Sequence, residues 1–367
     1  MIKGLYIHIP FCEIKCPYCD FTSFVWNEDG LKKRYVSALK KELSLYKELD
    51  FNLETIYFGG GTPSSLSPDL LAHIIKFIKE NIKTEKELEI TVEVNPKTYR
   101  YQDFKIIKDS GVNRVSIGNQ SFLEKNLISL GRNHKPEDTL QTVEDCIKAG
   151  ITNINLDLIY GIPGQTLDDL EKDLKIYTEL PITHISAYML TAYEGTPLGT
   201  LVKNGCYNLP DEETTLKMFE LIDSFLEEKK FKRYELSNWA KEGYQCKHNL
   251  FYWTHTEFLG IGVSSWSFVN NLRFGNTKNI EEYLELVEKS VKPIKFTEEL
   301  NEEKKREEEI FLSLRLKSGV DLNLIKNKDI IKDLLEEEYA AVENGRLVLL
   351  AKGIMVLNEI AVKLILS

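Results

Sequence analysis

The sequence predicts an α/β fold built on a partial (β/α)6 TIM-like barrel, with a lateral sheet extension and a small C-terminal helical or winged-helix-like domain. Short apolar, partly β-branched runs alternate with longer amphipathic runs, and this alternation stops after about Gly195. Such alternation predicts a parallel sheet with right-handed crossovers. Six units are fewer than the eight of a closed TIM barrel, so we expect an open one. A doubly wound open sheet would show the same alternation, and periodicity does not separate the two.

The strand candidates are nearly continuous apolar runs, as expected of strands that are covered on both faces. They are Leu5–Phe11, Thr55–Gly59, Leu88–Val94, Arg114–Gly118, Asn153–Tyr160 and His184–Leu190. Helical candidates lie between them, at Leu31–Tyr46, Pro68–Ile82, Pro136–Ala149 and Leu167–Leu180. Residues 1–195 are therefore predicted to form the barrel.

The pattern after the barrel predicts two further parts. A long helix is expected at Asp211–Lys230, with strand-like pieces at Phe231–Leu236, Leu250–Trp253 and Ser264–Phe268. Residues 196–297 are accordingly expected to extend the sheet. The charged run Glu298–Glu309 opens a helix, and Gly345–Leu349 resembles a hairpin. Residues 298–367 are expected to form the small C-terminal domain, whose acidic lead-in favours a lid or docking role over DNA binding.

Composition narrows the class of protein. The 367 residues are 43% hydrophobic and 28% charged, with a formal net charge of -10, which is typical of a globular protein and argues against a nucleic-acid-binding surface. No apolar run approaches the ~20 residues of a membrane span, and no signal-peptide pattern opens the chain. We therefore expect a cytoplasmic protein whose six cysteines are ligands or buried thiols. Cys146 is expected to be a buried small hydrophobe, and Cys206 and Cys246 receive no role.

The remaining cysteines form a triplet directly after the first strand. Cys12, Cys16 and Cys19 follow a C-x3-C-x2-C spacing. Four thiolates would saturate a [4Fe–4S] cluster, so three leave one iron open to a small molecule. Loops after the C-terminal ends of barrel strands are also where barrel chemistry occurs. A structural zinc site with a distant fourth ligand, or three unrelated thiols, is the alternative that the spacing leaves open.

The segment around the triplet resembles a known superfamily. Tyr6-Ile7-His8-Ile9-Pro10-Phe11-Cys12 running into Cys16-Pro17-Tyr18-Cys19 is similar to the radical S-adenosylmethionine (SAM) superfamily. Within it, nearly the whole chain resembles the oxygen-independent coproporphyrinogen III oxidase family. The resemblance implies a [4Fe–4S] cluster on the three cysteines, SAM as a second cofactor, and an electron donor for the cluster.

The resemblance also implies a set of SAM contacts at successive strand ends. The segment Gly60-Gly61-Thr62 is expected to hold the methionine amino group, and Arg132 the methionine carboxylate, because a guanidinium fork matches a carboxylate. Glu93 is expected to pair with the ammonium or the ribose hydroxyls, and Asp157 to accept from ribose hydroxyls. Further SAM contacts are expected at Tyr6, Tyr18, Gln120 and Ser264. Each polar residue alone fits a structural role, whereas a shared ligand accounts for several at successive strand ends.

Two features point to the heme chaperone branch of this family. The oxidase branch has a further cysteine two positions after the third cluster cysteine, where this chain has Phe21. The run His248-Asn249-Leu250-Phe251-Tyr252-Trp253 matches the His-Asn-x-x-Tyr-Trp motif of the chaperone branch. The resemblance implies that heme is bound and passed to acceptor proteins, membrane-bound respiratory proteins among them. His248 is the expected axial ligand, with Tyr252 and Trp253 packing on the macrocycle. Without the resemblance, the residue pattern of this segment favours a core strand with a hydrogen-bonded histidine and ordinary aromatic packing.

The sequence is therefore consistent with three functions. The first is a heme-transfer chaperone that uses a [4Fe–4S] cluster and SAM. The second is an oxidase that converts coproporphyrinogen III to protoporphyrinogen IX by radical decarboxylation. The third is a radical enzyme acting on another tetrapyrrole. The missing cysteine and the histidine motif favour the first, and the sequence leaves open whether SAM is cleaved productively.

Overall fold

The computed structural model describes residues 1–26 and 28–366. In that part of the chain, twelve strands form one sheet in the order β14-β13-β12-β11-β1-β4-β5-β6-β7-β8-β10-β9, which does not close into a barrel. Its centre is the predicted parallel array, and each neighbouring pair from β1 to β8 is parallel. These strands are β1 (Ile2–Ile9), β4 (Phe51–Gly60), β5 (Thr84–Val94), β6 (Arg114–Gln120), β7 (Asn153–Tyr160) and β8 (His184–Met189). The prediction of an open, partial barrel is confirmed.

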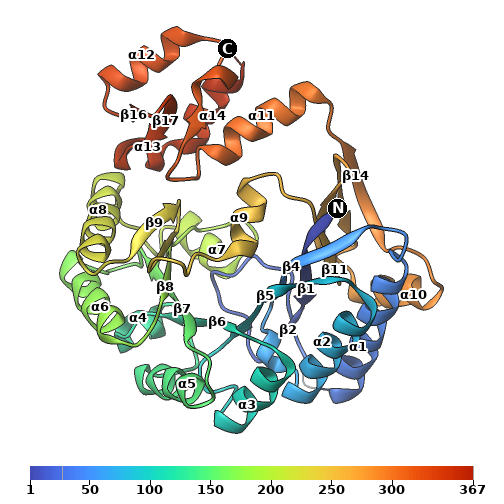
Figure 1. Ribbon diagram of the computed structural model, residues 1–367. Coiled ribbons are helices and arrows are strands. Elements are labelled where there is room, and N and C mark those ends of the chain that lie inside the picture. The colour runs from blue at the N-terminus through green and yellow to red at the C-terminus, as the bar shows by residue number, and fades with distance from the viewer. Residues whose placement is uncertain (27, 367) are drawn as a thin grey trace.

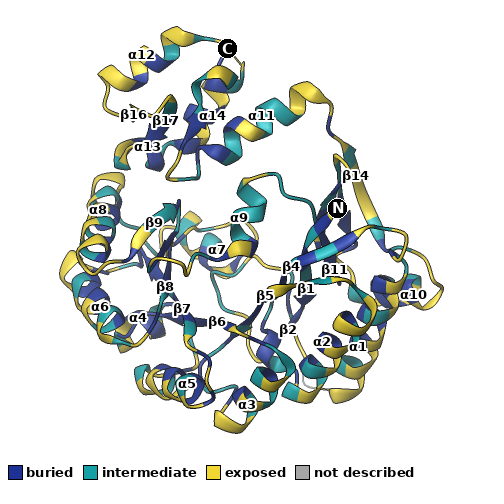
Figure 2. Cartoon of the chain, viewed as in Figure 1, coloured by how far each residue is buried: buried dark blue, intermediate teal, exposed yellow. Residues whose placement is uncertain are grey.

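Helices follow the parallel strands and cover the outer face of the curved sheet (Figure 1). They are α1 (Asp29–Ser44), α2 (Pro68–Asn81), α3 (Tyr101–Ser110), the short α4 (Glu124–Ser129), α5 (Pro136–Lys148) and α6 (Leu167–Glu179). Their sequences place apolar residues at three- and four-residue spacing, so one stripe of each helix faces the sheet. In α2 this buried stripe is Leu71, Ile74, Ile75 and Ile78. The strands are therefore buried on their outer side by helices, while the helices' outer faces remain exposed (Figure 2).

The sheet extension lies on both sides of the parallel array. On one side, β10 (Asn238–Ala240) and β9 (Lys232–Glu235) continue antiparallel beyond β8. On the other side, β11 (Phe258–Ile261) pairs parallel with β1. Three antiparallel strands continue from it, β12 (Trp266–Val269), β13 (Leu272–Asn276) and β14 (Ile294–Glu299). Helices α7 (Pro197–Lys203), α8 (Glu212–Glu228) and α10 (Ile280–Glu288) belong to the same region.

One predicted strand is wrong. Leu250–Trp253 forms the end of helix α9 (Lys247–Trp253). The helix begins where the Glu89 carboxylate of β5 accepts the backbone N–H groups of Lys247 (3.2 Å) and His248 (3.3 Å). A carboxylate at the first turn satisfies amides that have no partner within the helix. Because this partner comes from a distant strand, the local sequence does not show it.

The C-terminal unit contains the predicted helices and hairpin. It consists of α11 (Glu302–Ser313), β15 (Val320–Asp321), α12 (Lys328–Glu336), β16 (Ala340–Glu343), β17 (Arg346–Leu349), α13 (Ala351–Met355) and α14 (Leu357–Leu366). Its small sheet has the order β15-β17-β16, and α11 and α13 pack against α9 and α8 of the main body. None of the helices described is long and apolar enough to cross a membrane.

A buried carboxylate joins α1 to the extended side of the sheet. Glu42 has no exposed surface and accepts hydrogen bonds from Gly262 N (2.8 Å), Asn276 Nδ2 (2.6 Å) and Tyr283 Oη (2.6 Å). Three donors favour the ionised carboxylate, but burial disfavours it more strongly and raises the pKa of Glu42 to about 7. The folded protein therefore holds this proton more tightly than the unfolded chain does.

Replacing this carboxyl changes how stability depends on pH. The unfolded pKa is near 4.5 and the folded pKa about 7, so the stability contributed by Glu42 is complete below the unfolded value and is lost as pH rises through 7. The wild type should lose about 2.5 kcal/mol of unfolding free energy relative to Glu42→Gln between about pH 5 and about pH 8. Urea unfolding of both proteins across this range measures the difference. Glu80→Gln, at an exposed position of α2, is the matched control. If the difference in unfolding free energy between the wild type and Glu42→Gln is the same at every pH, Glu42 does not have the raised pKa described here.

Candidate functional site

A large cavity opens at the C-terminal ends of the parallel strands. It has a volume of about 610 Å³, which is within the range of small-molecule sites. Most of the residues predicted from the sequence line it, namely Cys12, Cys16, Tyr18, Cys19, Gly60, Gly61, Thr62, Glu93, Gln120, Arg132 and Asp157. They come from the ends of β4, β5, β6 and β7 and from the loops that follow strands β1 and β6. The parallel register thus brings together residues that are far apart in the sequence.

The three cysteines lie on a loop between two short strands. Cys12 ends β2 (Phe11–Cys12), and the loop with Cys16 and Cys19 leads to β3 (Phe24–Val25), which pairs with β2. All three are free, partly buried thiols, and burial raises the pKa of Cys12 and Cys19. Among the described residues, no group of three or more histidine, cysteine, aspartate or glutamate side chains is arranged around a single metal ion. The donor set of three thiols on one cavity wall suits an iron–sulfur cluster.

Arg132 lies beside this loop and carries an unused donor. Its Nη1 donates to Cys16 Sγ (3.4 Å), and its Nη2 donates to Asn95 Oδ1 (2.8 Å) and Gly118 O (2.7 Å). Its Nε is buried and is left without a hydrogen-bond partner. A buried donor without a partner costs free energy, so an acceptor such as a carboxylate would be stabilised here.

The glycines after β4 allow two chain segments to pack closely. Gly61 N donates to Ile9 O (2.8 Å) and Thr62 N to Phe11 O (2.9 Å). A Cβ on Gly61 would lie 2.9 Å from the carbonyl carbon of Pro10, and a Cβ on Gly60 would lie 2.5 Å from the His8 ring. Gly60 also has φ +111°, a value that side chains disfavour. These glycines therefore place Thr62 Oγ1 3.5 Å from Cys12 Sγ.

Two partly buried carboxylates line the cavity, Glu93 at the end of β5 and Asp157 within β7. Glu93 accepts from Tyr57 Oη (2.8 Å) and Gly60 N (3.2 Å), and Asp157 accepts from Asn155 Nδ2 (2.7 Å). Burial raises the pKa of Glu93 to about 7 and that of Asp157 to about 6. A cation bound between them would favour their ionised forms.

Several cavity residues were missed at the sequence level. Asn95 donates to Thr62 Oγ1 (2.9 Å) and thereby joins the Gly-Gly-Thr segment to Arg132. Tyr188, Met189 and Tyr193 line the cavity mouth. These residues lie at or just after the end of a predicted strand. That position could have identified them as lining residues, because the ends of neighbouring parallel strands lie at the same edge of the sheet.

Five predicted contacts lie outside the cavity lining. Tyr6 Oη interacts with His8 Nδ1 (3.1 Å), and its ring stacks on that of Tyr57 with 6.2 Å between centroids. Ser264 Oγ accepts from Thr22 Oγ1 (2.9 Å) and ties the cysteine loop to the turn after β11. The other three, His248, Tyr252 and Trp253, belong to α9. Tyr6 and Ser264 thus support the segments that carry the lining residues.

The motif histidine is enclosed behind this site. His248 has no exposed surface. Its Nδ1 pairs with Thr55 Oγ1 (2.6 Å), and its Nε2 pairs with Tyr252 Oη (2.9 Å). Burial lowers its pKa to about 3, so the ring is neutral. Ligation of heme iron by His248 stays a prediction, and it requires one of these two hydrogen bonds to open.

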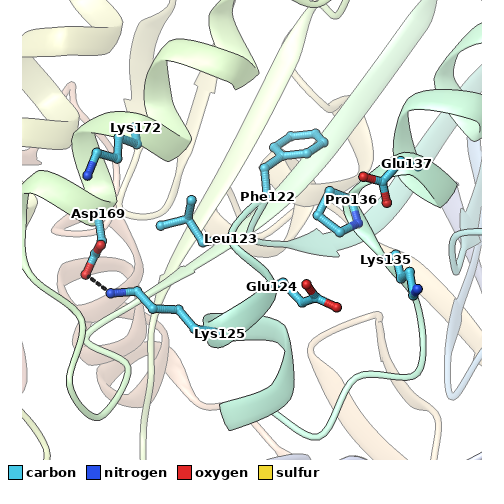
Figure 3. Close-up of a pocket in the computed structure, with 9 residues that line it drawn as sticks. All are labelled: Phe122, Leu123, Glu124, Lys125, Lys135, Pro136, Glu137, Asp169 and Lys172. Carbon is cyan, nitrogen blue, oxygen red and sulfur yellow. Dashed lines mark hydrogen bonds and ion pairs between the residues drawn. The ribbon is translucent and has the colours of Figure 1, made fainter.

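A second, shallower cavity lies on the outer surface at the starts of α4, α5 and α6 (Figure 3). Its volume is about 380 Å³. Lysine and acidic side chains are mixed around it, and Lys125 Nζ forms an ion pair with Asp169 across one side (2.6 Å). None of the residues predicted from the sequence lines it.

Comparison with known proteins agrees with the architecture. Residues 6–176 match the model of the radical SAM superfamily. The crystal structure of coproporphyrinogen III oxidase (HemN) from Escherichia coli superposes with a TM-score of 0.84 over 98% of this chain and 89% of that chain, at 21% sequence identity, which shows a shared fold.

Curated relatives match the chain from end to end. The heme chaperone HemW of Bacillus subtilis is 34% identical over 98% of both chains. The heme chaperone HemW of Lactococcus lactis is 33% identical over 100% of this chain and 98% of its own. The chain therefore belongs to the HemW family within the radical SAM superfamily.

Proposed function

We propose that the protein is a heme chaperone, which binds heme and passes it to acceptor proteins, with a [4Fe–4S] cluster and SAM in the large cavity. The observation that carries this proposal is the similarity to the Bacillus subtilis heme chaperone over 98% of both chains. At this coverage only a few residues of either chain lie outside the match. Phe21 supports the choice, because it occupies the position of the oxidase branch's additional cysteine and offers no ligand or redox group.

Cys12, Cys16 and Cys19 would hold the cluster through three of its irons. Arg132 Nη1, which donates to Cys16 Sγ at 3.4 Å, would hold that ligand in place beside the cluster. When bound and reduced, the cluster would supply an electron to the sulfonium of SAM. The elevated pKa values of Cys12 and Cys19 indicate that these thiols stay protonated until a metal replaces the proton.

The residues around the cluster loop would hold SAM by its polar groups. The Nε of Arg132 is free to donate to the methionine carboxylate, and Glu93 together with the Gly60–Thr62 segment would accept the ammonium. Asp157 would accept from the ribose hydroxyls.

The heme assignment predicts loading and delivery of the cargo. Reconstituted protein, titrated anaerobically with hemin, should show a saturable Soret change and should then transfer heme to apomyoglobin. The same preparation, reduced and supplied with SAM and coproporphyrinogen III, should leave that substrate unconverted because Phe21 replaces the cysteine. Absorbance and porphyrin chromatography make the two measurements. Formation of protoporphyrinogen IX would favour the oxidase instead, and a wild type that binds no heme would refute the chaperone assignment.

The SAM assignment predicts a pH dependence of binding. Glu93 must lose its proton to pair with the ammonium, and its pKa is about 7. SAM affinity should therefore rise roughly tenfold from about pH 6 to about pH 8. Glu93→Gln should weaken binding at the upper pH by about tenfold and flatten most of this rise, with Asp157 leaving a smaller one. Isothermal titration of the cluster-loaded protein measures it.

The matched control for this measurement is Glu13→Gln. Glu13 is an exposed carboxylate that lines the same cavity, so its replacement should leave both the affinity and its pH profile as in the wild type. A Glu93→Gln protein that keeps the wild-type pH profile would remove Glu93 from the SAM site.

A further inference from the structure

We propose that heme binds at the mouth of the large cavity, between the cysteine loop and the end of β8, with the Met189 sulfur as the protein ligand to its iron. This inference rests on the proposed chaperone function and adds the location of the cargo. Nothing in it requires the α9 motif to open.

The first observation is a set of exposed apolar side chains around this mouth. Phe21 and Ile14 of the cysteine loop are 63% and 39% exposed, and Tyr188, Met189 and Tyr193 are 43–48% exposed. All five line the cavity. Isolated exposed apolar residues are ordinary, but a contiguous group around a cavity marks a binding surface. The group lies where an apolar ligand would contact both sides of the opening.

The second observation is that buried apolar residues anchor the chain segments on both sides of the mouth. Leu198 N of α7 donates to Pro17 O of the cysteine loop (2.9 Å), and this bond joins the cysteine loop to the helix that follows Tyr193 along the chain. A separate apolar cluster is formed by Leu130, Ile159, Ile162, Leu190 and Leu198, with Tyr18 packed against it. Tyr18 belongs to the cysteine loop and Leu190 directly follows Met189, so both chain segments at the mouth are anchored in this cluster, as a preformed site requires.

The chemistry of the lining fits heme in particular. Heme presents a large flat apolar macrocycle, an iron with axial positions and two propionates. Methionine and tyrosine are established axial ligands, and no histidine of the described residues lines this cavity. Met189 offers an accessible thioether at the end of β8, which ligates iron without losing a proton, whereas the phenol of the neighbouring Tyr188 would have to lose one. Lys15, exposed on the same rim, provides a cation for a propionate.

The α9 histidine offers no comparable site. Both ring nitrogens of His248 are occupied at 2.6 and 2.9 Å, and its side chain is fully buried. Its ring also stacks on Tyr57 with 5.1 Å between centroids, and Tyr57 holds Glu93. This geometry makes His248 a positioning residue for the wall of the cavity. Heme at the mouth would then cover SAM, so SAM must enter first.

The experiment compares variants of the cluster-loaded protein in anaerobic hemin titrations. Met189→Leu keeps the apolar bulk but removes the sulfur, so it should lose the thioether-to-ferric-iron charge-transfer band and shift the Soret maximum. Phe21→Ser should weaken heme affinity by about tenfold or more, because it removes a large apolar contact. Val25→Ser is the control, since Val25 is 53% exposed in β3 but does not line the cavity. Cluster iron content and SAM binding verify that each variant folds.

A second measurement tests the position of heme relative to SAM. Protein preloaded with labelled SAM should release it about tenfold more slowly after hemin is added, because the mouth is closed, and Phe21→Ser should reduce this effect. Equal release with and without hemin would overturn the location.

The outcomes separate the inference from the function on which it rests. The mouth site is overturned if Met189→Leu and Phe21→Ser both keep the wild-type spectrum and heme affinity. If His248→Gln also loses the Soret change, heme is assigned to the α9 motif. In that case the chaperone function would stand. Failure of the wild type to bind hemin at all would instead refute the proposed function.

Discussion

The packing of the glycine turn after β4 on the end of β1 is the contact on which the cavity depends. Two backbone hydrogen bonds, from Gly61 and Thr62 to the carbonyls of Ile9 and Phe11, bring the Gly-Gly-Thr segment against the start of the cysteine loop. From there a chain of contacts runs from Cys12 to Thr62, then to Asn95, then to Arg132 and back to Cys16. A side chain at Gly61 would separate the two segments, so one backbone contact positions thiols, donors and carboxylates together.

A second layer of polar contacts supports this arrangement from behind. Tyr57 donates to Glu93 and stacks on His248, and Thr55 and Tyr252 fix the histidine ring. The α9 motif thereby supports the cavity wall that Glu93 lines. Glu89 of β5 accepts amides from the first turn of α9, which anchors that helix against the barrel. The cavity wall and the histidine motif are therefore in direct contact, so a substitution in one is expected to displace side chains of the other.

The sequence was sufficient for features that are encoded locally. Apolar runs located the six parallel strands, and most of the site residues expected from the cysteine spacing and the strand-end polar residues line the cavity. Long-range partners decided what the sequence could not show. The Glu89 carboxylate accepts the first backbone amides of α9, the helix that contains Leu250–Trp253. The buried Glu42 carboxylate joins α1 to the turn after β11 and to β13. The lateral extension was expected without a particular edge, and the structure adds strands at both edges of the parallel array.

The central claim is that three thiolates hold a cluster with one open iron, and iron–sulfur reconstitution tests it most directly. Purified protein, treated anaerobically with iron and sulfide, should bind about four irons per chain with the Mössbauer signature of a [4Fe–4S] cluster. SAM should perturb one iron site only. Replacing any one of Cys12, Cys16 and Cys19 by Ala should abolish the cluster, while Cys206→Ala, at an exposed thiol outside the cavity, should retain it. A single tetrahedral zinc at these thiols, or no metal, would contradict the account.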